Sequence, residues 1–538
     1  MRGRTPLSLA VAGAAALTMV AAGCSSTPQA QDERFILQFY LGEPQHLLTT
    51  NTNESEGSQV LAALYEALVD FDEQARPVMA AAESITTEDN KTWTIKLKEG
   101  RTFHNGEPVD ADSFIQAWNY GAYGPNGQGN NYFFEFIEGY AEMNPQEEGQ
   151  EPTATELSGL KKIDDLTFEV TLHNPFSEFP LVLGYTPFYP LPDAAFSEPG
   201  VIDEEFEQAP IGNGPFKMVG TWQHDQLIQV EKWADFKGTQ PKIDGVDFRI
   251  YTGETAVNTA YNDLQANNID VMDTIPIDAL ATAEQDLNGR YETSPSSTFQ
   301  YLAFPVTNPK YSNPNVRKAI SMAIDRQEQI ELVFQNSQRA ADAFVSPVVA
   351  GYRPGACGEA CEFNPTEAKA LYEANNGPRE ISITYNADGG HAPWVEATCN
   401  QLELNLGVEC TPIGEPRFRD VLDKLDAGED IGFFRLGWIM DYPSMQNYLG
   451  PLYSTNGSSN YYGYSNPEFD ELVKKGETAS SQEEAIKFYQ QAEDILAQDV
   501  PVIPMRFGQN NYGYSERVTN VYFDQFGRCD LIRIEPAV

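Results

Sequence analysis

The chain has 538 residues, of which 41% are hydrophobic and 12% aromatic, a composition that excludes a disordered chain. Its 35 basic and 79 acidic residues give a net charge of -44, which argues against nucleic acid as a partner and favours solubility. The length exceeds what one hydrophobic core usually serves, so we expect two or three domains.

The N-terminus has the pattern of an export signal. Arg2 and Arg4 precede an uncharged, Ala-rich apolar run over residues 7–22 that is short for a membrane span. A polar stretch follows this run, which predicts a cleaved signal over residues 1–23 and a short tether over residues 24–32.

Cys24 follows small residues and resembles the acylated cysteine of the bacterial lipobox, although Ala21 stands where that pattern usually has Leu. The resemblance implies a lipid anchor on Cys24. An ordinary secretory signal, with cleavage near Ala22, is the alternative.

The first half of the chain alternates between strand and helix patterns. Apolar and polar residues alternate over residues 93–98 and 166–172, which predicts two half-buried strands. Between them, residues 111–120 have a helical period, and Asp110 is placed to cap this helix. Further along, strand-like runs occur at 227–230, 246–250 and 269–271, with a helical period at 256–266.

The second half continues this alternation. The turn Asn313-Pro314-Asn315 leads into a predicted helix from Val316 to about Ile330. Other helical periods lie at 365–374, 395–406, 417–427, 467–475 and 482–497, with short apolar strands at 381–385 and 431–436. The alternation predicts the α/β class, with two sheet-centred lobes.

Five cysteines remain besides Cys24, in a compartment where disulfides persist. The simplest pairing joins Cys357 to Cys361 and Cys399 to Cys410, because both bonds close short loops, and it leaves Cys529 free. No CxxC pair and no neighbouring His completes a tetrahedral metal site, and the five histidines form no zinc motif. We therefore expect no metal and no cofactor.

Five groups of residues form a recognisable series in chain order. They are WTIKLKEG at 93–100 with FHNGEPVDADS at 103–113, IGNGPF at 211–216, NPNVRKAI at 313–320, AIDR at 323–326, and RLGWIMDYP at 435–443. Together they resemble the extracellular solute-binding proteins of family 5, the dipeptide and oligopeptide receptors of ABC importers. The resemblance covers nearly all of the chain after the signal.

The resemblance implies a two-lobed, periplasmic-binding-protein-like α/β fold (type II, cluster C) with an extra domain inserted in the first lobe. Lobe I would comprise residues 33–76, 206–297 and 506–538, the inserted domain residues 77–205, and lobe II residues 298–505. A short peptide would bind between the lobes and favour the closed form by contacting both. We expect a monomer that is held at the outer face of the cell membrane by its lipid anchor and delivers peptides to an ABC permease and ATPase complex.

The stretch from Arg435 to Asp441 carries the functional prediction. An apolar strand over residues 431–434 leads to Arg435, and Asp441 follows where α/β lobes present ligand-binding loops. A zwitterionic peptide needs a carboxylate for its ammonium group and a cation for its carboxylate, and these two residues supply one of each. In the resembling family, the matching Asp holds the peptide's α-amino group and the matching Arg lies in the same pocket, near the ligand backbone or carboxylate.

Weaker candidates surround this pair. They are Trp438 as a wall of a side-chain pocket, Tyr442 and Asn447 on the same loop, and Tyr40 and Glu43 in the opening strand and loop of the first lobe. Two structural alternatives stay open: Asp441 as the N-cap of a short helix that starts at Tyr442, and Arg435 as an ion-pair partner in the core.

Three other functions compete with peptide capture. A secreted hydrolase would need a nucleophile and its base, but the sequence has no GxSxG elbow, no zinc motif and no catalytic cysteine context. The same fold binding a nickel chelate, a sugar or an opine is disfavoured by Asp441. A surface adhesion or signalling receptor with this fold is distinguished by the absence of neighbouring permease and ATPase genes.

Overall fold

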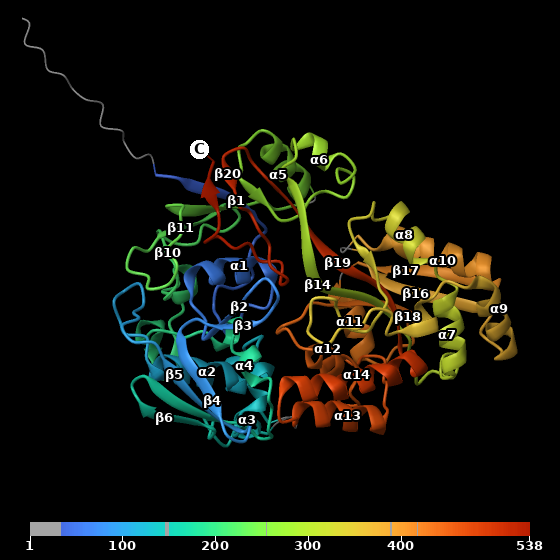
Figure 1. Cartoon of the computed structure of the whole chain (residues 1–538), viewed down its shortest axis with the longest axis horizontal. Coiled ribbons are helices and arrows are strands. Elements are labelled where there is room, and N and C mark those ends of the chain that lie inside the picture. Colours follow the sequence, from blue (N-terminus) through green and yellow to red (C-terminus); the bar gives the residue numbers. More distant parts are fainter. Residues whose placement is uncertain (1–33, 146–149, 254, 388–389, 417, 538) are drawn as a thin grey trace, which may run out of the picture. The chain divides into compact units, whose positions relative to one another are not determined.

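The computed structural model describes residues 34–145, 150–253, 255–387, 390–416 and 418–537 (Figure 1). The described residues from Phe35 onward form one compact unit. The predicted signal, the tether and the acylated Cys24 lie outside the described residues. In the part of the chain that is described, no helix is long and apolar enough to cross a membrane.

An eleven-stranded sheet runs through the compact unit. In sheet order its strands are β10 (Phe216–Met218), β11 (Leu227–Lys232), β12 (Gly245–Ile250), β1 (Ile36–Leu41), β13 (Val271–Met272), β19 (Val502–Tyr514), β14 (Tyr291–Ala303), β18 (Phe433–Trp438), β16 (Glu380–Asn386) and β17 (Glu409–Glu415), with β15 (Arg339–Ala340) paired to β19. We name the side with β1 and β10–β13 lobe I, and the side with β15–β18 lobe II.

Two long strands connect the lobes. β14 and β19 are antiparallel, each has 13 residues, and they pair from Tyr291 with Gly513 to Ala303 with Val502 (Figure 1). One end of β19 pairs with β13 of lobe I, whereas the other end of β14 pairs with β18 of lobe II. The predicted lobe boundaries, 297/298 and 505/506, fall inside these two strands, close to shifts in their pairing register. The boundaries themselves stay predictions.

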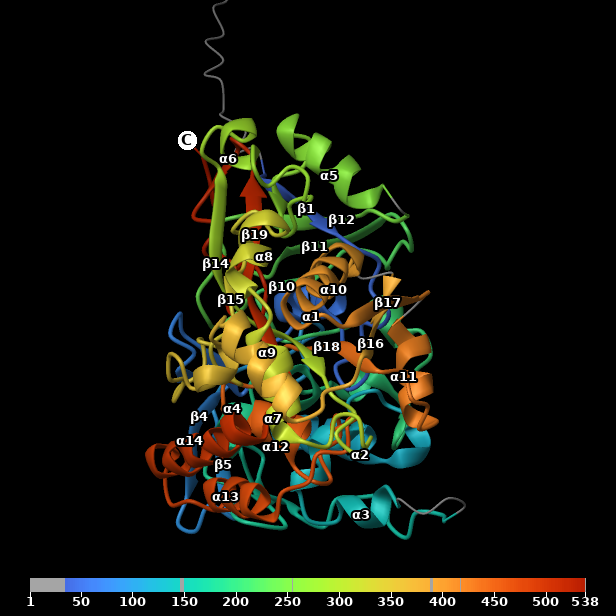
Figure 2. The same cartoon turned by 90° about the vertical axis from the view of Figure 1, so that its right-hand side faces the viewer.

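Helices cover both lobes. Those of lobe I are α1 (Ser55–Leu64), α5 (Ala256–Gln265) and α6 (Ala283–Asp286). Those of lobe II are α7 (Pro314–Met322), α8 (Arg326–Leu332), α9 (Pro365–Ala374), α10 (Ala392–Leu406), α11 (Phe418–Asp426), α12 (Gln446–Tyr453), α13 (Pro467–Glu477) and α14 (Gln482–Asp499). α10 and α11 pack on β16 and β17, as Figure 2 shows.

The segment between the first two parts of lobe I, residues 77–205, is called here the inserted segment. Its antiparallel sheet has the strand order β4 (Ala82–Thr87), β5 (Thr92–Leu97), β7 (Thr167–Thr171) and β6 (Leu160–Asp164). Its helices are α2 (Ala111–Ala122), α3 (Tyr140–Met143) and α4 (Phe179–Val182). The remaining strands form three small pairs, β2 (Val69–Phe71) with β3 (Pro77–Met79), β8 (Phe196–Glu198) with β9 (Val201–Ile202), and β20 (Val518–Thr519) with β21 (Glu535–Pro536).

The start of α2 agrees with the prediction from sequence. The Ser113 backbone N–H donates to the Asp110 carboxylate at 3.1 Å, and the Asp110 N–H donates to Ser113 Oγ at 3.2 Å, which completes a capping box. β5 buries Trp93, Ile95 and Leu97 on one face, as their alternation with polar residues indicates.

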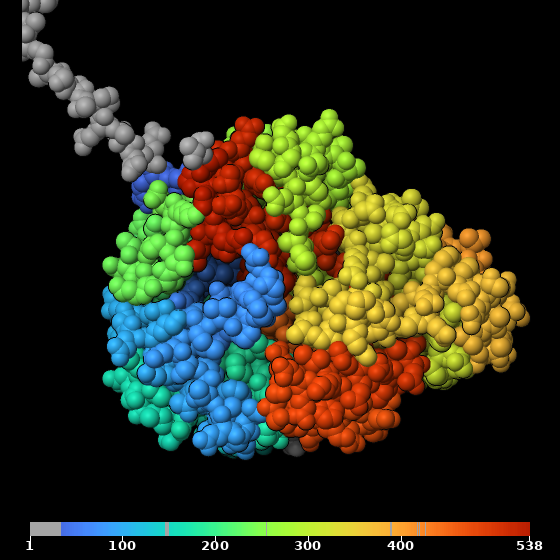
Figure 3. All heavy atoms as spheres, viewed as in Figure 1, coloured from blue at the N-terminus to red at the C-terminus, as the bar shows by residue number. Residues whose placement is uncertain are grey.

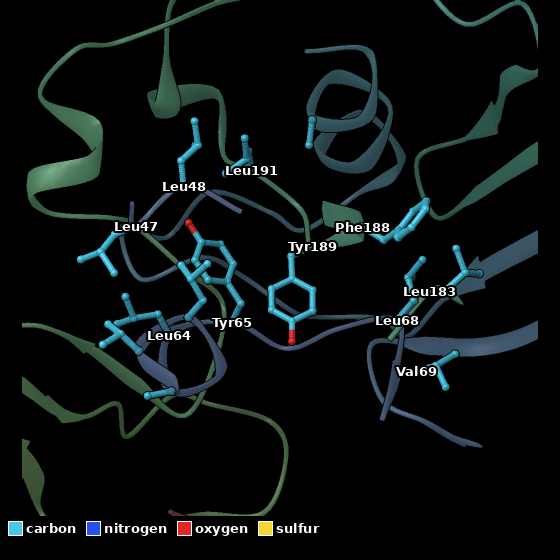
Figure 4. Close-up of a cluster of buried hydrophobic side chains, with 14 of the residues drawn as sticks. Leu47, Leu48, Leu64, Tyr65, Leu68, Val69, Leu183, Phe188, Tyr189 and Leu191 are labelled. Atoms are coloured by element: carbon cyan, nitrogen blue, oxygen red, sulfur yellow. The ribbon is translucent and has the colours of Figure 1, made fainter. Parts of the chain in front are cut away.

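Lobe I and the inserted segment share one hydrophobic core, whereas lobe II has its own clusters. Figure 4 shows part of the shared core, where Tyr65 at the end of α1 packs against Tyr189 of the inserted segment. The centroids of these two rings are 5.9 Å apart. Because the core is continuous across the join, the inserted segment is held against lobe I by burial of apolar surface.

Two helix predictions in lobe II need correction. The single helix expected over residues 316–330 is divided into α7 and α8, because Asp325 adopts an extended backbone and its carboxylate accepts the Glu328 N–H at 3.0 Å. α10 begins at Ala392, three residues before the predicted start, because Pro393 fits the first turn of a helix. The sequence also gave no prediction for α1 or α12.

The cysteines lie as the simplest pairing places them. Cys357 is bonded to Cys361 and Cys399 to Cys410, with Cα–Cα distances of 5.8 and 5.1 Å. Cys529 is free and buried in the shared core of lobe I. Both bonds therefore tie short segments within lobe II.

Candidate ligand-binding site

A cavity of about 1540 Å³ lies between the inserted segment and lobe II. One wall comes from residues between 128 and 144, together with Ser158 and His173–Phe176. The other comes from the end of β18, the loop that follows it, α12 and α13. Of the predicted residues, Trp438, Asp441, Tyr442 and Asn447 line this cavity. It has the size of a ligand site rather than of a packing defect.

Asp441 is the acidic group of the loop between β18 and α12. Burial raises the pKa of its carboxyl to about 7, although a hydrogen bond from Asn447 lowers it. Among the described residues no Lys, Arg or His forms an ion pair with it, and Asn447 Nδ2, at 2.9 Å, is its hydrogen-bond donor. Asp441 is thus a carboxylate that lacks a counter-charge at the wall of a cavity.

Asn447, at the start of α12, fixes the position of Asp441. Its Oδ1 accepts the Asp441 backbone N–H at 2.8 Å and Trp438 Nε1 at 3.2 Å, while its Nδ2 donates to Asp441 Oδ2. Only 1% of Asn447 is exposed. One buried amide therefore links the end of β18, the loop and the first turn of α12, so that the carboxylate is held ready before any ligand arrives.

Tyr132 of the inserted segment lines the same cavity as Asp441. Burial raises the pKa of both Tyr132 and Tyr185, and the nearby negative charge of Asp441 adds to each shift. Tyr132 lines the cavity and is partly accessible. The carboxylate of lobe II and the aromatic wall of the inserted segment therefore belong to one site.

The same loop touches the inserted segment directly. Ser444 Oγ donates to Glu178 Oε2 at 2.8 Å, and both residues are at most 2% exposed. Nearby, Asn90 Nδ2 donates to the Ala479 carbonyl at 3.1 Å. Figure 3 shows this contact along its lower edge, where the blue and teal atoms of the inserted segment meet the orange-red atoms near residue 480.

The N-cap interpretation of Asp441 is wrong. The helix after the loop begins at Gln446, and its N-cap is Met445. Pro443 has no N–H to offer, and the Asp441 carboxylate accepts a side-chain amide instead. Tyr442 lies in the loop with 2% exposure, and its hydroxyl donates to Gln446 Oε1.

Arg435 lies apart from this cavity. Because side chains alternate along a strand, Arg435 points to the opposite face of β18 from Leu436 and Trp438. Its Nη1 donates to Asn386 Oδ1 at 3.1 Å, and its Nε and Nη2 donate to Gln300 Oε1 at 3.1 and 2.6 Å. The structure therefore does not bring the predicted Asp441–Arg435 pair together in one pocket.

The two lobe I candidates also lie outside the lining of the cavity. Tyr40 is 9% exposed and packs against Tyr251, and burial followed by the charge of Asp273 raises its pKa to about 12. Glu43 lies 2.8 Å from His224 Nδ1 and accepts the Asp225 N–H at 3.0 Å. Both residues contact other residues of lobe I.

Several lining residues were not predicted from the sequence. Tyr132, Glu135 and Glu477 line the cavity, and Glu178 supports its loop, but none belongs to a quoted motif. The aromatic run from Tyr132 to Phe136 was the one available signal for the inserted wall. No group of three or more His, Cys, Asp and Glu side chains suited to a metal ion occurs within the ranges described above.

Comparison with known proteins agrees with this architecture. The model of the bacterial extracellular solute-binding proteins, family 5 (middle region), matches residues 76–460. The oligopeptide-binding protein OppA of Bacillus subtilis is 27% identical over 499 residues, which cover 89% of this chain and 88% of OppA. The dipeptide-binding protein DppE of the same organism is 27% identical over 473 residues, or 86% of this chain and 84% of DppE.

Solved structures show the same fold. The Escherichia coli murein tripeptide binding protein MppA superposes with a TM-score of 0.76 at 21% identity, covering 94% of this chain and 99% of MppA. Haemophilus influenzae OppA in complex with RPPGFSPFR gives a TM-score of 0.73 at 22% identity, with 94% and 100% covered. The expected two-lobed α/β fold is confirmed. Since the family model spans well over half of its length, the chain belongs to the bacterial extracellular solute-binding proteins of family 5.

Proposed function

We propose that the protein captures short peptides outside the cytoplasmic membrane and delivers them to an ABC import permease and its ATPases. One observation carries this proposal: Asp441 is a partly buried carboxylate, without a cationic partner among the described residues, at the wall of a cavity of about 1540 Å³. The names of the relatives OppA and DppE, an oligopeptide-binding and a dipeptide-binding protein, support peptide as the ligand class.

The chemistry of a peptide's amino end fits this carboxylate. An ammonium group supplies the positive charge that Asp441 lacks, and its N–H groups donate charge-assisted hydrogen bonds, which are the stronger kind. Tyr132 of the inserted segment and Trp438 of lobe II both line the cavity that would hold this amino end. Because ligand contacts with both walls favour the closed arrangement, binding and closure are coupled.

Arg435 is left out of this proposal, because it lies on the face of β18 opposite Trp438 and outside the lining of the cavity. Its guanidinium donates to Asn386 and Gln300 within lobe II. The proposal therefore assigns residues to the amino end of the peptide alone, with Asp441 for the ammonium group and Trp438, Tyr442 and Asn447 beside it.

Attachment to the membrane is a separate part of the proposal. The sequence around Cys24 supports cleavage of the signal and acylation of the thiol, which would hold the compact unit at the outer face of the membrane. Mass spectrometry of the protein extracted from the membrane fraction tests this. An acylated Cys24 at the N-terminus is expected, and a Cys24→Ser protein is expected to be released in soluble form.

Calorimetric titration tests the peptide assignment. We expect the protein from residue 25 onward, which retains the whole compact unit, to bind di- to pentapeptides with free amino termini. N-acetylation of the same peptides should weaken binding at least about tenfold, because one charge-assisted hydrogen bond is lost. Asp441→Ala should remove this difference. Equal affinity for free and acetylated peptides would contradict the role of Asp441.

A further inference from the structure

The lining of the cavity carries more negative than positive side chains, which affects the peptides that it can bind. Six carboxylate residues line it: Glu135, Glu138, Glu142, Asp441, Asp470 and Glu477. Among the described lining residues, Lys474 is the one Lys or Arg side chain. A zwitterionic peptide carries no net charge, so its two termini leave this imbalance unchanged.

Three of the carboxylates line the same cavity from different parts of the chain. Asp441 lies on the loop after β18, Glu477 at the end of α13, and Glu135 in the inserted segment. Gln446 joins Glu477 to the loop, because its Nε2 donates to Glu477 at 2.9 Å and its Oε1 accepts from Tyr442, the residue after Asp441. Asp441, Glu135 and Glu477 are therefore the carboxylates that the proposed function places around the amino end of a peptide.

The carboxylates differ in how far the protein already compensates them. Glu138 pairs with Lys91 Nζ at 2.8 Å, and Asp470 accepts the Thr455 N–H at 2.9 Å. Glu477 accepts Gln446 Nε2 at 2.9 Å, and the charge of Lys474 also lowers its pKa against the raising effect of burial. Glu135 makes no hydrogen bond or ion pair with the described residues. Glu135 is solvent-accessible at the wall, so its charge is available to a ligand.

The acidic character of the whole chain does not account for this arrangement. On the sheet of the inserted segment, Glu83 pairs with Lys96 and Glu169 with Lys161, each at 2.8 Å. On that sheet, lysine side chains of the chain itself neutralise the glutamates. At the cavity, neither Glu135 nor Asp441 forms an ion pair with a described residue, and the aromatic rings that line the same cavity also attract cations.

We propose that this cavity selects peptides with a lysine or arginine side chain at the first or second position, held by Glu135 and Glu477 while Asp441 holds the α-ammonium group. The inference rests on the proposed function and narrows its ligand class to amino-terminally basic peptides. A basic side chain supplies the second positive charge that the wall lacks. Tyr132 and Trp438 flank its aliphatic stem, which buries its methylene groups against the rings.

The test compares two sets of three matched tripeptides with free termini, in which lysine, norleucine or glutamate stands at position one in the first set and at position two in the second. Calorimetry at 0.15 M salt should give affinities at least about tenfold higher for lysine than for norleucine, the factor that one charge-assisted hydrogen bond supplies. The glutamate peptides should bind more weakly than the norleucine peptides, because like charges repel across the wall.

Two variants assign the preference to the wall. Glu135→Gln and Glu477→Gln keep the shape of each side chain, and each should reduce the preference for lysine over norleucine several-fold. Glu396→Gln is the matched control, because the substitution removes the same charge from an exposed glutamate on α10, outside the cavity lining. It should keep the full preference.

The outcomes separate this inference from the proposed function. If norleucine peptides bind within about twofold of lysine peptides, well under the tenfold of one charged contact, and N-acetylation still weakens binding, the charge preference is overturned while peptide capture stands. A lysine preference that persists in both wall variants would equally overturn the assignment to Glu135 and Glu477. If no peptide binds, both proposals fall.

Discussion

Asp441 and Glu178 are carboxyls on the two sides of the contact between lobe II and the inserted segment, Asp441 partly buried and Glu178 fully buried. Burial raises the pKa of each to about 7. Glu178 accepts a hydrogen bond from Ser444 at 2.8 Å within a closed contact, and it does not line the cavity. Asp441, three residues before Ser444, lines the cavity and is held by a single amide.

The difference teaches that a raised pKa alone does not mark a binding group. Burial produces the same shift at both places, because the protein interior disfavours the charged form of any carboxyl. The two residues differ in what lies next to their carboxyl groups. Glu178 accepts a hydrogen bond from Ser444 of lobe II within the contact between the two walls. Asp441 lines the cavity, where a cationic group of a ligand can reach it.

Replacement of Asp441 by Asn should have the largest effect. The amide keeps the shape and the contact with Asn447 but removes the charge, so affinity for free-amino peptides should fall about hundredfold, the upper end for a hydrogen bond to a charged group. N-acetylated peptides should bind the variant and the original protein alike. Calorimetric titration with both peptide forms measures this.

Glu178→Gln is the matched control for that experiment. It also neutralises a buried carboxyl but retains an oxygen that accepts from Ser444. Peptide affinity should change less than about threefold, because the substituted group meets no ligand. A loss as large as that of Asp441→Asn would show that Glu178 acts on the ligand and would remove the distinction between the two carboxyls.

The pH dependence of peptide affinity should show the next largest effect. In the ligand-free protein the Asp441 carboxyl has a pKa of about 7, and it must ionise to bind an ammonium group. As pH falls below 7 the ionised fraction falls, while the peptide's ammonium stays protonated, so affinity should decrease up to about tenfold per pH unit. Titrations from pH 8 to pH 5.5 measure this slope.

The variants identify the group responsible for that slope. Asp441→Asn should make affinity nearly independent of pH over this range, whereas Glu178→Gln should keep the slope. A slope that persists without the Asp441 carboxyl would assign the titration to another acidic residue of the wall.

The stability of the ligand-free protein should change by a smaller amount. A carboxyl whose folded pKa is raised from about 4 to about 7 contributes stability below pH 4, and that contribution is lost as pH rises through 7. Both Asp441→Asn and Glu178→Gln should therefore raise the free energy of unfolding at pH 8, by on the order of 1 kcal/mol, and by less at pH 5. Urea unfolding at the two pH values tests this, and a destabilisation at pH 8 would contradict it.

Much of the fold was predictable because local signals were strong. The capping box at Asp110, the alternation along β5 and the Pro start of α9 at Pro365 each fix an element from a few neighbouring residues. β14 and β19 gave no such signal. Each is a long strand whose two ends belong to different lobes, and their pairing joins residues about 200 positions apart, from Tyr291 with Gly513 to Ala303 with Val502.

The site was predicted in part, and the reason is geometric. Asp441, Trp438 and Asn447 were found because they follow one another through a loop that ends on the cavity. Arg435 was grouped with them because it is near in sequence, but an alternating strand places it on the other face of β18. The inserted wall with Tyr132 and Glu135 lies some 300 residues away along the chain and carries no motif, so sequence alone could not join it to Asp441.

Trp438→Phe should have the smallest effect on affinity. It removes the indole N–H that donates to Asn447 at 3.2 Å but leaves the two bonds between Asn447 and Asp441. Asn447, which positions Asp441, then loses one hydrogen bond, while Asp441 keeps its charge. Affinity should therefore fall only about threefold, which is within the contribution of one neutral hydrogen bond. Trp222→Phe is the matched control, since the Trp222 indole N–H is buried in lobe I and has no hydrogen-bond partner among the described residues.

The Trp438 variant also separates two roles of the indole. If it only holds Asn447, the loss should be equal for peptides of every sequence, and N-acetylation should still weaken binding as it does in the original protein. If the ring instead forms a wall for the first side chain, the loss should grow with the size or charge of that side chain. A loss near that of Asp441→Asn would mean that the carboxylate depends on Trp438 for its position, so that the support and the charge act as one unit.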